Sequence, residues 1–105
     1  MKELSNSEKI VIACIYKHLG TTHEKPNLHD LESILLNGYG IVWKLQTLCT
    51  FIKRIENKGY ITVSRSGRYS YFTPVMQYDD YIKEELKSIA SIYFDGDTAT
   101  IKKYI

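Results

Sequence analysis

The sequence predicts a mainly α-helical fold of the α+β class, with four helices and one short β-hairpin. Apolar residues recur at helical spacing in four segments, and two short runs of β-branched and aromatic residues flank a glycine. Capping and breaking residues separate these segments. At 105 residues, 44% of them hydrophobic, the chain is long enough for one compact domain with a short appended helical segment.

The first helix is expected from about Asn6 to Leu19, before Gly20. Ser5 and Glu8 have the spacing of a capping box, in which each side chain bonds the other residue's backbone N–H. Apolar residues lie on most sides of this segment. We therefore expect it at the centre of the core.

A second helix is expected after Asn27, a favourable N-cap residue, and it is expected to end at Asn37 and Gly38. A turn then leads to a third helix from about Ile41 to Lys58, with Gly59 as a left-handed cap. The apolar residues of the second helix are Leu28, Leu31, Ile34 and Leu35.

The third helix has two chemically distinct faces at 100° per residue. The apolar face carries Leu48, Phe51, Ile52 and Ile55. The opposite, polar stripe carries Gln46, Thr50, Lys53 and Asn57. We expect the first face in the core and the second in solvent.

The hairpin is expected from two strands, Tyr60–Val63 and Tyr69–Thr73, joined by residues 64–68 and ended by Pro74. A fourth helix is expected from Asp79 until Asp95-Gly96-Asp97 breaks it, before a short tail. Two helices, a turn, a third helix and a two-stranded wing give the order of a winged helix-turn-helix domain. We assign residues 1–75 to this DNA-binding domain and 76–105 to a C-terminal helical dimerisation segment.

The basic charge is concentrated in the middle of the chain. The net charge is +2, but residues 41–73 hold six basic residues against Glu56 alone, a balance of +5. Residues 1–40 and 74–105 are slightly acidic, at −1 and −2. Such a patch is the footprint of a polyanion site, and the alternative is an ordinary solvated basic face.

DNA recognition needs side chains that hydrogen-bond base edges and cations that hold phosphates. For base contacts we select Gln46, Thr47 and Thr50, and for phosphate contacts Lys44, Lys53, Arg54, Arg65 and Arg68, together with Ser66. Trp43 has two open interpretations. It packs between the third helix and the turn, or it donates its indole N–H to a phosphate.

A family resemblance follows from these segments. The run from Trp43 to Ile61 resembles the signature W-x-x-K-T-V-x-T-x-L-x-R-L-x-x-K-G-x-L of the penicillinase-repressor family, which includes β-lactamase, methicillin-resistance and copper-transport repressors. The match continues with Gly67-Arg68, Tyr71, Thr73-Pro74 and Asp80-Tyr81, and with Lys83–Ser88 and Phe94–Asp97. At Lys44 and Leu45 the family commonly has Ser-Pro instead.

The resemblance implies a dimeric repressor that places one winged domain on each half of an inverted-repeat operator in double-stranded DNA. The fourth helix agrees, because it carries more apolar surface than one small domain covers. Its dimerisation residues would be Ile82, Leu86, Ile89, Ile92 and Tyr93. Packing of this helix on its own domain is the alternative.

The sequence favours no cofactor, no metal and no catalytic activity. The β-lactam-responsive relatives are cleaved at an Asn-Phe bond and the copper-responsive ones carry Cys-x-Cys pairs, and this chain has neither. Cys14, Cys49 and the three histidines show no recognised ligand spacing. We expect reduced thiols in a cytoplasmic protein, since no signal peptide or membrane span is evident.

Two other functions remain open at this point. A winged-helix module that docks a protein partner would be a monomer that leaves DNA unshifted. A non-specific DNA-binding accessory protein would bind duplexes without any half-site spacing. The leading hypothesis is a sequence-specific transcriptional repressor that binds as a homodimer.

Overall fold

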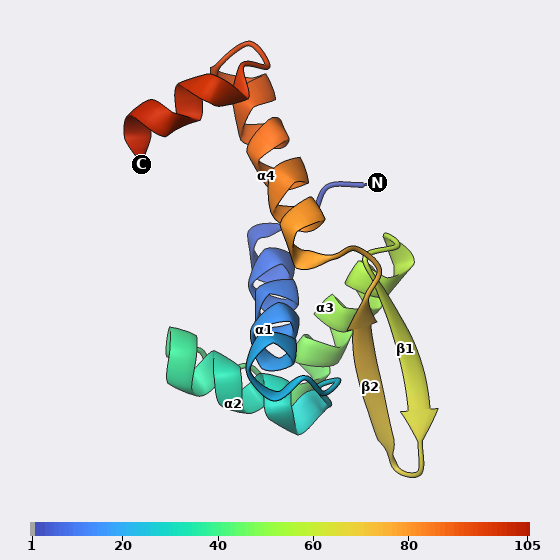
Figure 1. The fold of residues 1–105 in the computed structure, drawn as a ribbon. Helices are drawn as coiled ribbons and strands as arrows, with labels where there is room; N and C mark the ends of the chain where they lie inside the picture. The colour runs from blue at the N-terminus through green and yellow to red at the C-terminus, as the bar shows by residue number, and fades with distance from the viewer. Residues whose placement is uncertain (1) are drawn as a thin grey trace. The chain divides into compact units, whose positions relative to one another are not determined.

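The computed structural model describes residues 2–105, which form two compact units, one up to Val75 and one of Met76–Ile105 (Figure 1). The first unit consists of α1 (Asn6–Thr22), α2 (Leu28–Tyr39), α3 (Leu45–Asn57), β1 (Ile61–Ser66) and β2 (Tyr69–Pro74). The second unit consists of α4 (Tyr78–Tyr93) and the 3₁₀ helix η1 (Thr98–Tyr104). The helices and small antiparallel sheet confirm the predicted winged helix-turn-helix class.

Helix α1 forms the centre of the first unit, as predicted. It begins with the expected capping box, since the Glu8 N–H donates to Ser5 Oγ at 3.2 Å and the Ser5 N–H donates to Glu8 Oε1 at 2.8 Å. The helix contacts α2, α3 and β2. Its fully buried apolar residues are Val11, Ile12, Cys14 and Ile15.

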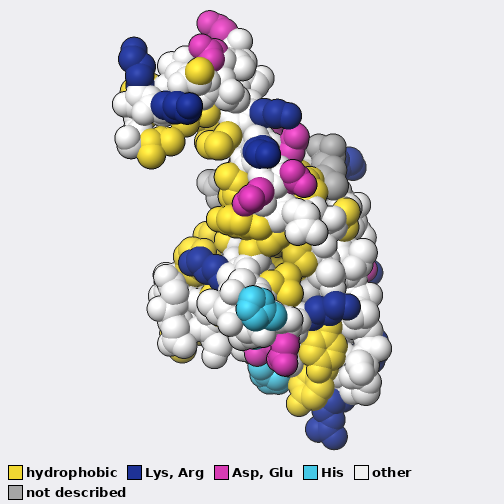
Figure 2. Space-filling model, in the orientation of Figure 1, with side chains coloured by type: hydrophobic (Ala, Val, Ile, Leu, Met, Phe, Trp, Pro, Cys, Tyr) yellow, Lys and Arg dark blue, Asp and Glu magenta, His cyan; other side chains and the backbone are white. Residues whose placement is uncertain are grey.

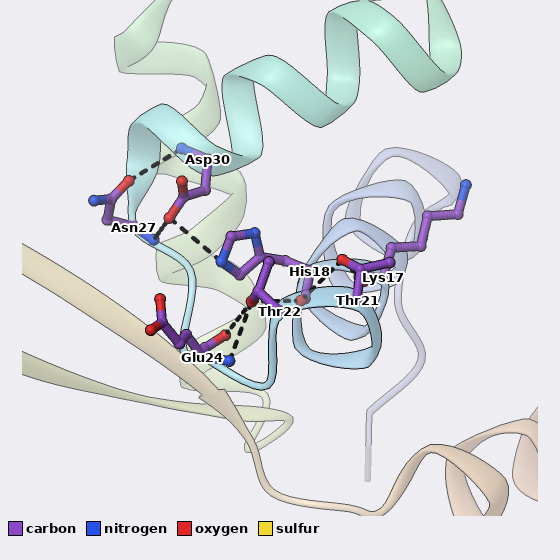
Figure 3. Close-up of polar contacts among 7 residues, drawn as sticks. All are labelled: Lys17, His18, Thr21, Thr22, Glu24, Asn27 and Asp30. Atoms are coloured by element: carbon purple, nitrogen blue, oxygen red, sulfur yellow. Dashed lines mark hydrogen bonds and ion pairs between the residues drawn. The ribbon is translucent and has the colours of Figure 1, made fainter.

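The predicted end of α1 at Leu19 is wrong. The helix continues through Gly20 to Thr22 and stops where His23 adopts a left-handed φ of 60°. The Thr22 hydroxyl donates to the His18 carbonyl at 2.8 Å and accepts the Glu24 N–H at 3.1 Å (Figure 3). These side-chain bonds stabilise the last turn and the exit of the chain, so a single glycine does not end the helix.

The start of α2 is fixed by polar contacts to its neighbours (Figure 3). Asn27 and Asp30 form a second capping box, with bonds of 2.9 and 3.0 Å. His18 Nε2 of α1 lies 3.6 Å from Asp30 Oδ2, and the Phe72 N–H of β2 donates to the Pro26 carbonyl at 3.0 Å. The first turn of α2 is therefore held to both α1 and the hairpin.

The predicted end of α2 at Asn37 and Gly38 is also wrong by about half a turn. The helix runs to Tyr39, and the cap is Gly40, whose φ is 65°. The Gly40 N–H bonds the carbonyls of Leu35 and Leu36, which closes the helix. A positive φ favours glycine, so Gly40, and not Gly38, ends the helix.

Helix α3 begins at Leu45, four residues later than the predicted start at Ile41. Residues 41–44 are not helical, and burial alternates along them, with Ile41 and Trp43 half-buried and Val42 and Lys44 exposed. This alternation is typical of an extended segment. The apolar Ile41 and Trp43 therefore cover the core from an extended chain and not from a helical turn.

The predicted faces of α3 are confirmed. Leu48, Ile52 and Ile55 are buried and Phe51 is half-buried, while the opposite polar stripe is exposed. Gly59 follows the helix with a φ of 87°, which agrees with the predicted left-handed cap.

The hairpin is longer than predicted and its turn is shorter. Pairing of β1 with β2 continues to Ser66 opposite Tyr69, so only Gly67 and Arg68 form the turn. Gly67 adopts a φ of 63°, which allows the chain to reverse in two residues. Arg65 consequently lies in β1, opposite Ser70, and not in a connecting loop.

Helix α4 of the second unit ends at the predicted break. Asp95 and Gly96 both have positive φ after α4, at 51° and 85°. The predicted short tail contains η1, which Asp97 caps through its carboxylate, and the Phe94 and Tyr104 rings stack with centroids 5.6 Å apart.

Candidate nucleic-acid interface

The outward face of α3 carries the polar side chains selected for base contacts. Gln46 and Thr50 are exposed and Thr47 is half-buried. The Thr50 hydroxyl donates to the Gln46 carbonyl at 2.9 Å, which leaves its oxygen as an acceptor. The Gln46 amide can present a donor and an acceptor together, which is the pattern that an adenine edge requires in the major groove.

Exposed cations border this face and extend to the hairpin. Within residues 2–105, no ion pair involves Lys44, Arg54, Arg65 or Arg68. Lys53 lies 3.9 Å from Glu56, a long contact between exposed groups that contributes little. These five positive charges are therefore available to an external polyanion. Figure 2 shows Lys and Arg side chains at the hairpin tip, the lowest part of the view.

Lys58 belongs to the core and not to this surface. Its ammonium group lies 2.6 Å from Glu8 Oε1 and donates to the Glu3 carbonyl at 3.0 Å. Burial alone would raise the pKa of the Glu8 carboxyl, but hydrogen bonds from Lys58 and the Ser5 N–H outweigh it and lower that pKa. Lys58 must therefore be removed from the basic excess counted in the sequence.

Trp43 packs in the structure. Its ring lies 4.9 Å from the Phe51 ring, between centroids, at a tilt of 55°. It also lines an apolar pocket with Leu35, Leu36 and Leu48. The packing holds the segment before α3 against the helix, and it positions the neighbouring Lys44.

A basic hollow of about 370 Å³ lies between the start of α2 and the hairpin. Its lining residues are Asn27, Leu28, His29, Arg65, Arg68, Tyr69 and Ser70. Two guanidinium groups, a hydroxyl and an imidazole thus border one concave surface. Such a set of donors suits an anion with several oxygen acceptors, for example a phosphate group.

A second hollow, of about 180 Å³, connects α3 to the hairpin and α2. It is lined by Leu28, Cys49, Ile52, Lys53, Glu56, Val63, Ser70 and Phe72. Because Leu28 and Ser70 line both hollows, the start of α2, the outer side of α3 and the hairpin form one continuous surface. The predicted residues Lys53, Arg65 and Arg68 are brought together on this surface.

Comparison with known protein families identifies the family to which the chain belongs. The family model for the penicillinase repressor matches residues 4–102, nearly the whole chain. The chain belongs to the penicillinase repressor family. No curated protein sequence matches it significantly. The family consists of DNA-binding transcriptional repressors, so the predicted class of regulator is confirmed.

The predicted dimerisation residues of this family member lie along one stripe of α4. Ile82 and Leu86 are half-buried, while Ile89, Ile92 and Tyr93 are exposed. Tyr81 and Ala90 are the buried residues of the helix. The last two turns of α4 thus expose an apolar stripe to solvent.

The thiols of this family member differ in environment. Cys14 is buried, and burial raises the pKa of its thiol to about 11 against a smaller opposing effect of Lys17, so the thiol stays protonated. Cys49 is exposed on α3. Across residues 2–105, no group of three or more His, Cys, Asp or Glu side chains is arranged to hold a metal ion. No helix in that range is long and apolar enough to cross a membrane.

Two features of the surface were not selected from the sequence of this family member. His29 lines the basic hollow, and its ring meets Tyr69 edge-on at 6.4 Å between centroids. Its position in the first turn of α2 could have revealed it, since the first helix of such motifs crosses the DNA backbone. Leu45 was not selected because apolar residues were assigned to the core, yet it is exposed.

Proposed function

We propose that this member of the penicillinase repressor family binds a dyad-symmetric operator as a homodimer. In each subunit, residues 1–75 form the DNA-binding domain, with α3 in the major groove and the hairpin on the flanking backbone. Residues 76–105 form the dimerisation segment. The observation that supports this most is the exposed polar face of α3, bordered by unpaired cations and continuous with the basic hollow.

Each side chain has a role that follows from its chemistry. Gln46, Thr47 and Thr50 hydrogen-bond base edges. Trp43 fixes the segment before α3 through its packing on Phe51. The residues that neutralise phosphates are Lys44, Lys53, Arg54, Arg65 and Arg68, which carry no sequence information but set the position of the domain on the duplex.

The homodimer is supported by the apolar stripe of α4. Ile92 and Tyr93 are 67% and 74% exposed, so packing within their own subunit leaves most of each apolar side chain uncovered. A second copy of the same helix would cover them symmetrically, because a two-fold interface uses the same patch on both subunits. The half-buried Ile82 and Leu86 and the exposed Ile89 continue the stripe.

Selection of bound duplexes from a random pool tests this proposal. We expect an inverted repeat whose half-sites are centred one helical turn, roughly 10 base pairs, or a multiple of it apart. Binding without a repeated half-site would instead indicate a non-specific DNA-binding protein. A monomer that shifts neither random nor selected DNA at low salt would indicate a protein-docking module.

A further inference from the structure

The first residue of α3 is an exposed leucine. Leu45 is 47% exposed and directly precedes Gln46. One turn later, Cys49 lies on the same side of the helix and is also exposed. An exposed leucine by itself is ordinary on a protein surface. Here it forms an apolar edge beside the polar stripe that faces DNA in the proposed function.

The apolar edge continues into the segment that leads to α3. Val42 is 81% exposed, in contrast to its half-buried neighbours Ile41 and Trp43. The alternation of this extended segment turns Val42 and Lys44 to the same side. Exposed apolar groups and a free ammonium group therefore occur together at the beginning of the helix.

The positive charge near Leu45 indicates which class of macromolecule would cover this side chain. Lys44 directly precedes it, and Lys53 follows about two turns later in α3. Lys53 lines the second hollow, which shares Leu28 and Ser70 with the basic hollow. A protein partner seated on Leu45 would also cover these cations, whereas duplex DNA would neutralise them. The occupant that fits both the charge and the position is the major groove.

In the major groove, the thymine C5-methyl is the apolar group on a base edge, and the N-terminal residues of a recognition helix contact these edges. We propose that Leu45 reads a thymine methyl in each half-site, next to the base pair read by Gln46. The inference rests on the proposed function and deepens it, because it names an apolar determinant of the operator. A hydrogen bond to a base edge does not involve this methyl, whereas an apolar group contacts it directly.

Replacing thymine by deoxyuridine in the selected operator tests the proposal. Deoxyuridine lacks only the C5-methyl and keeps every hydrogen-bonding group. We expect about fourfold weaker binding of the protein when one thymine in a single half-site is replaced, which is the effect of exposing one buried methyl group. In Leu45→Ala, the thymine and deoxyuridine operators are expected to bind equally.

Two further variants serve as controls. Leu45→Met keeps an apolar side chain of similar volume, so it is expected to retain most of the fourfold difference. Val75 lies outside α3 and is 54% exposed, so Val75→Ala removes exposed apolar surface away from that helix. This variant is expected to retain the full fourfold difference.

Two results would overturn the inference while the proposed function stands: every deoxyuridine operator binds as tightly as its parent, or the loss persists in Leu45→Ala. A selected operator with no thymine in its half-sites would do the same. A random pool that yields no preferred sequence would overturn the proposed function together with this inference.

Discussion

At the scale of single residues, the contact between Glu8 and Lys58 joins α1 to the residue that follows α3. Glu8 is 1% exposed, and its carboxylate accepts the Ser5 N–H and the Lys58 ammonium group. Lys58 follows α3 directly, and Ser5 precedes α1. This partly buried ion pair therefore joins the start of the central helix to the end of α3.

Removal of one partner of this pair is expected to destabilise the fold. Lys58→Met leaves a buried carboxylate without its cation and should lower the free energy of unfolding by about 3 kcal/mol. Urea denaturation at a fixed protein concentration measures this change. The matched variant Lys53→Met, on an exposed side chain of the same helix, should change it by less than about 0.5 kcal/mol. Equal effects of the two variants would contradict the role of the pair.

The same pair has a defined pH dependence. Because the folded state lowers the pKa of Glu8 below its ordinary value of 4.5, the pair stabilises the protein above that pH and loses its contribution as the pH falls further. In Lys58→Met, burial and the Ser5 hydrogen bonds remain but the lowering effect of Lys58 is lost, so the pKa of Glu8 lies higher than in the wild type. Acidification should therefore destabilise this variant less than the wild type.

The sequence predicted the capping box but not the ion pair, and the reason is physical. The capping boxes depend on residues three apart and were predicted at Ser5 and Glu8. The Glu8–Lys58 pair joins residues 50 positions apart, and no local pattern indicates such a contact. Lys58 was consequently counted with the cations that face solvent.

At the scale of elements, α3 begins without a side-chain cap. Its N-cap residue is Lys44, which makes no capping hydrogen bond. The resemblance places a serine at this position in the family. The exposed ammonium group also lies at the positive end of the helix dipole, where it is unfavourable. In the proposed function, the charge at this position serves the DNA contact at the expense of helix stability.

Lys44→Ser should separate these two effects. A serine oxygen can accept a backbone N–H of the first turn, so the free energy of unfolding should rise by about 1 kcal/mol. The salt dependence of DNA binding should become shallower by roughly 2 per dimer, because two cations are lost. Lys44→Ala should show the same change in salt dependence without most of the gain in stability. Equal stability of the two variants would contradict the missing cap.

Element boundaries show where sequence patterns reach their limit. The faces of α3 were predicted because they depend on helical periodicity alone. The start of α3 was placed too early because Ile41 and Trp43 are apolar, and an extended segment over a core satisfies the same composition. The hairpin turn was placed too long because strand pairing to Ser66 depends on the partner strand.

At the scale of the whole molecule, the candidate interface combines the start of α2, the outer side of α3 and the hairpin. The order of elements and the family motif were sufficient to predict the fold class. The basic hollow was not predicted, because it depends on the hydrogen bond from Phe72 to Pro26 and on the position of α2 beside the hairpin. Periodicity within one segment carries no information on such neighbours.

The salt dependence of binding, measured for the wild type and two variants on selected and random duplexes, tests the central claim most directly. If about four of the five cations in each subunit each neutralise one phosphate, the slope of log affinity against log salt should be roughly −7 for the dimer. Gln46→Ala should weaken binding to the selected duplex about tenfold and leave the random duplex unchanged. Arg68→Ala should weaken binding to both duplexes and make the slope shallower. A flat salt response, or equal losses on both duplexes for Gln46→Ala, would contradict the account.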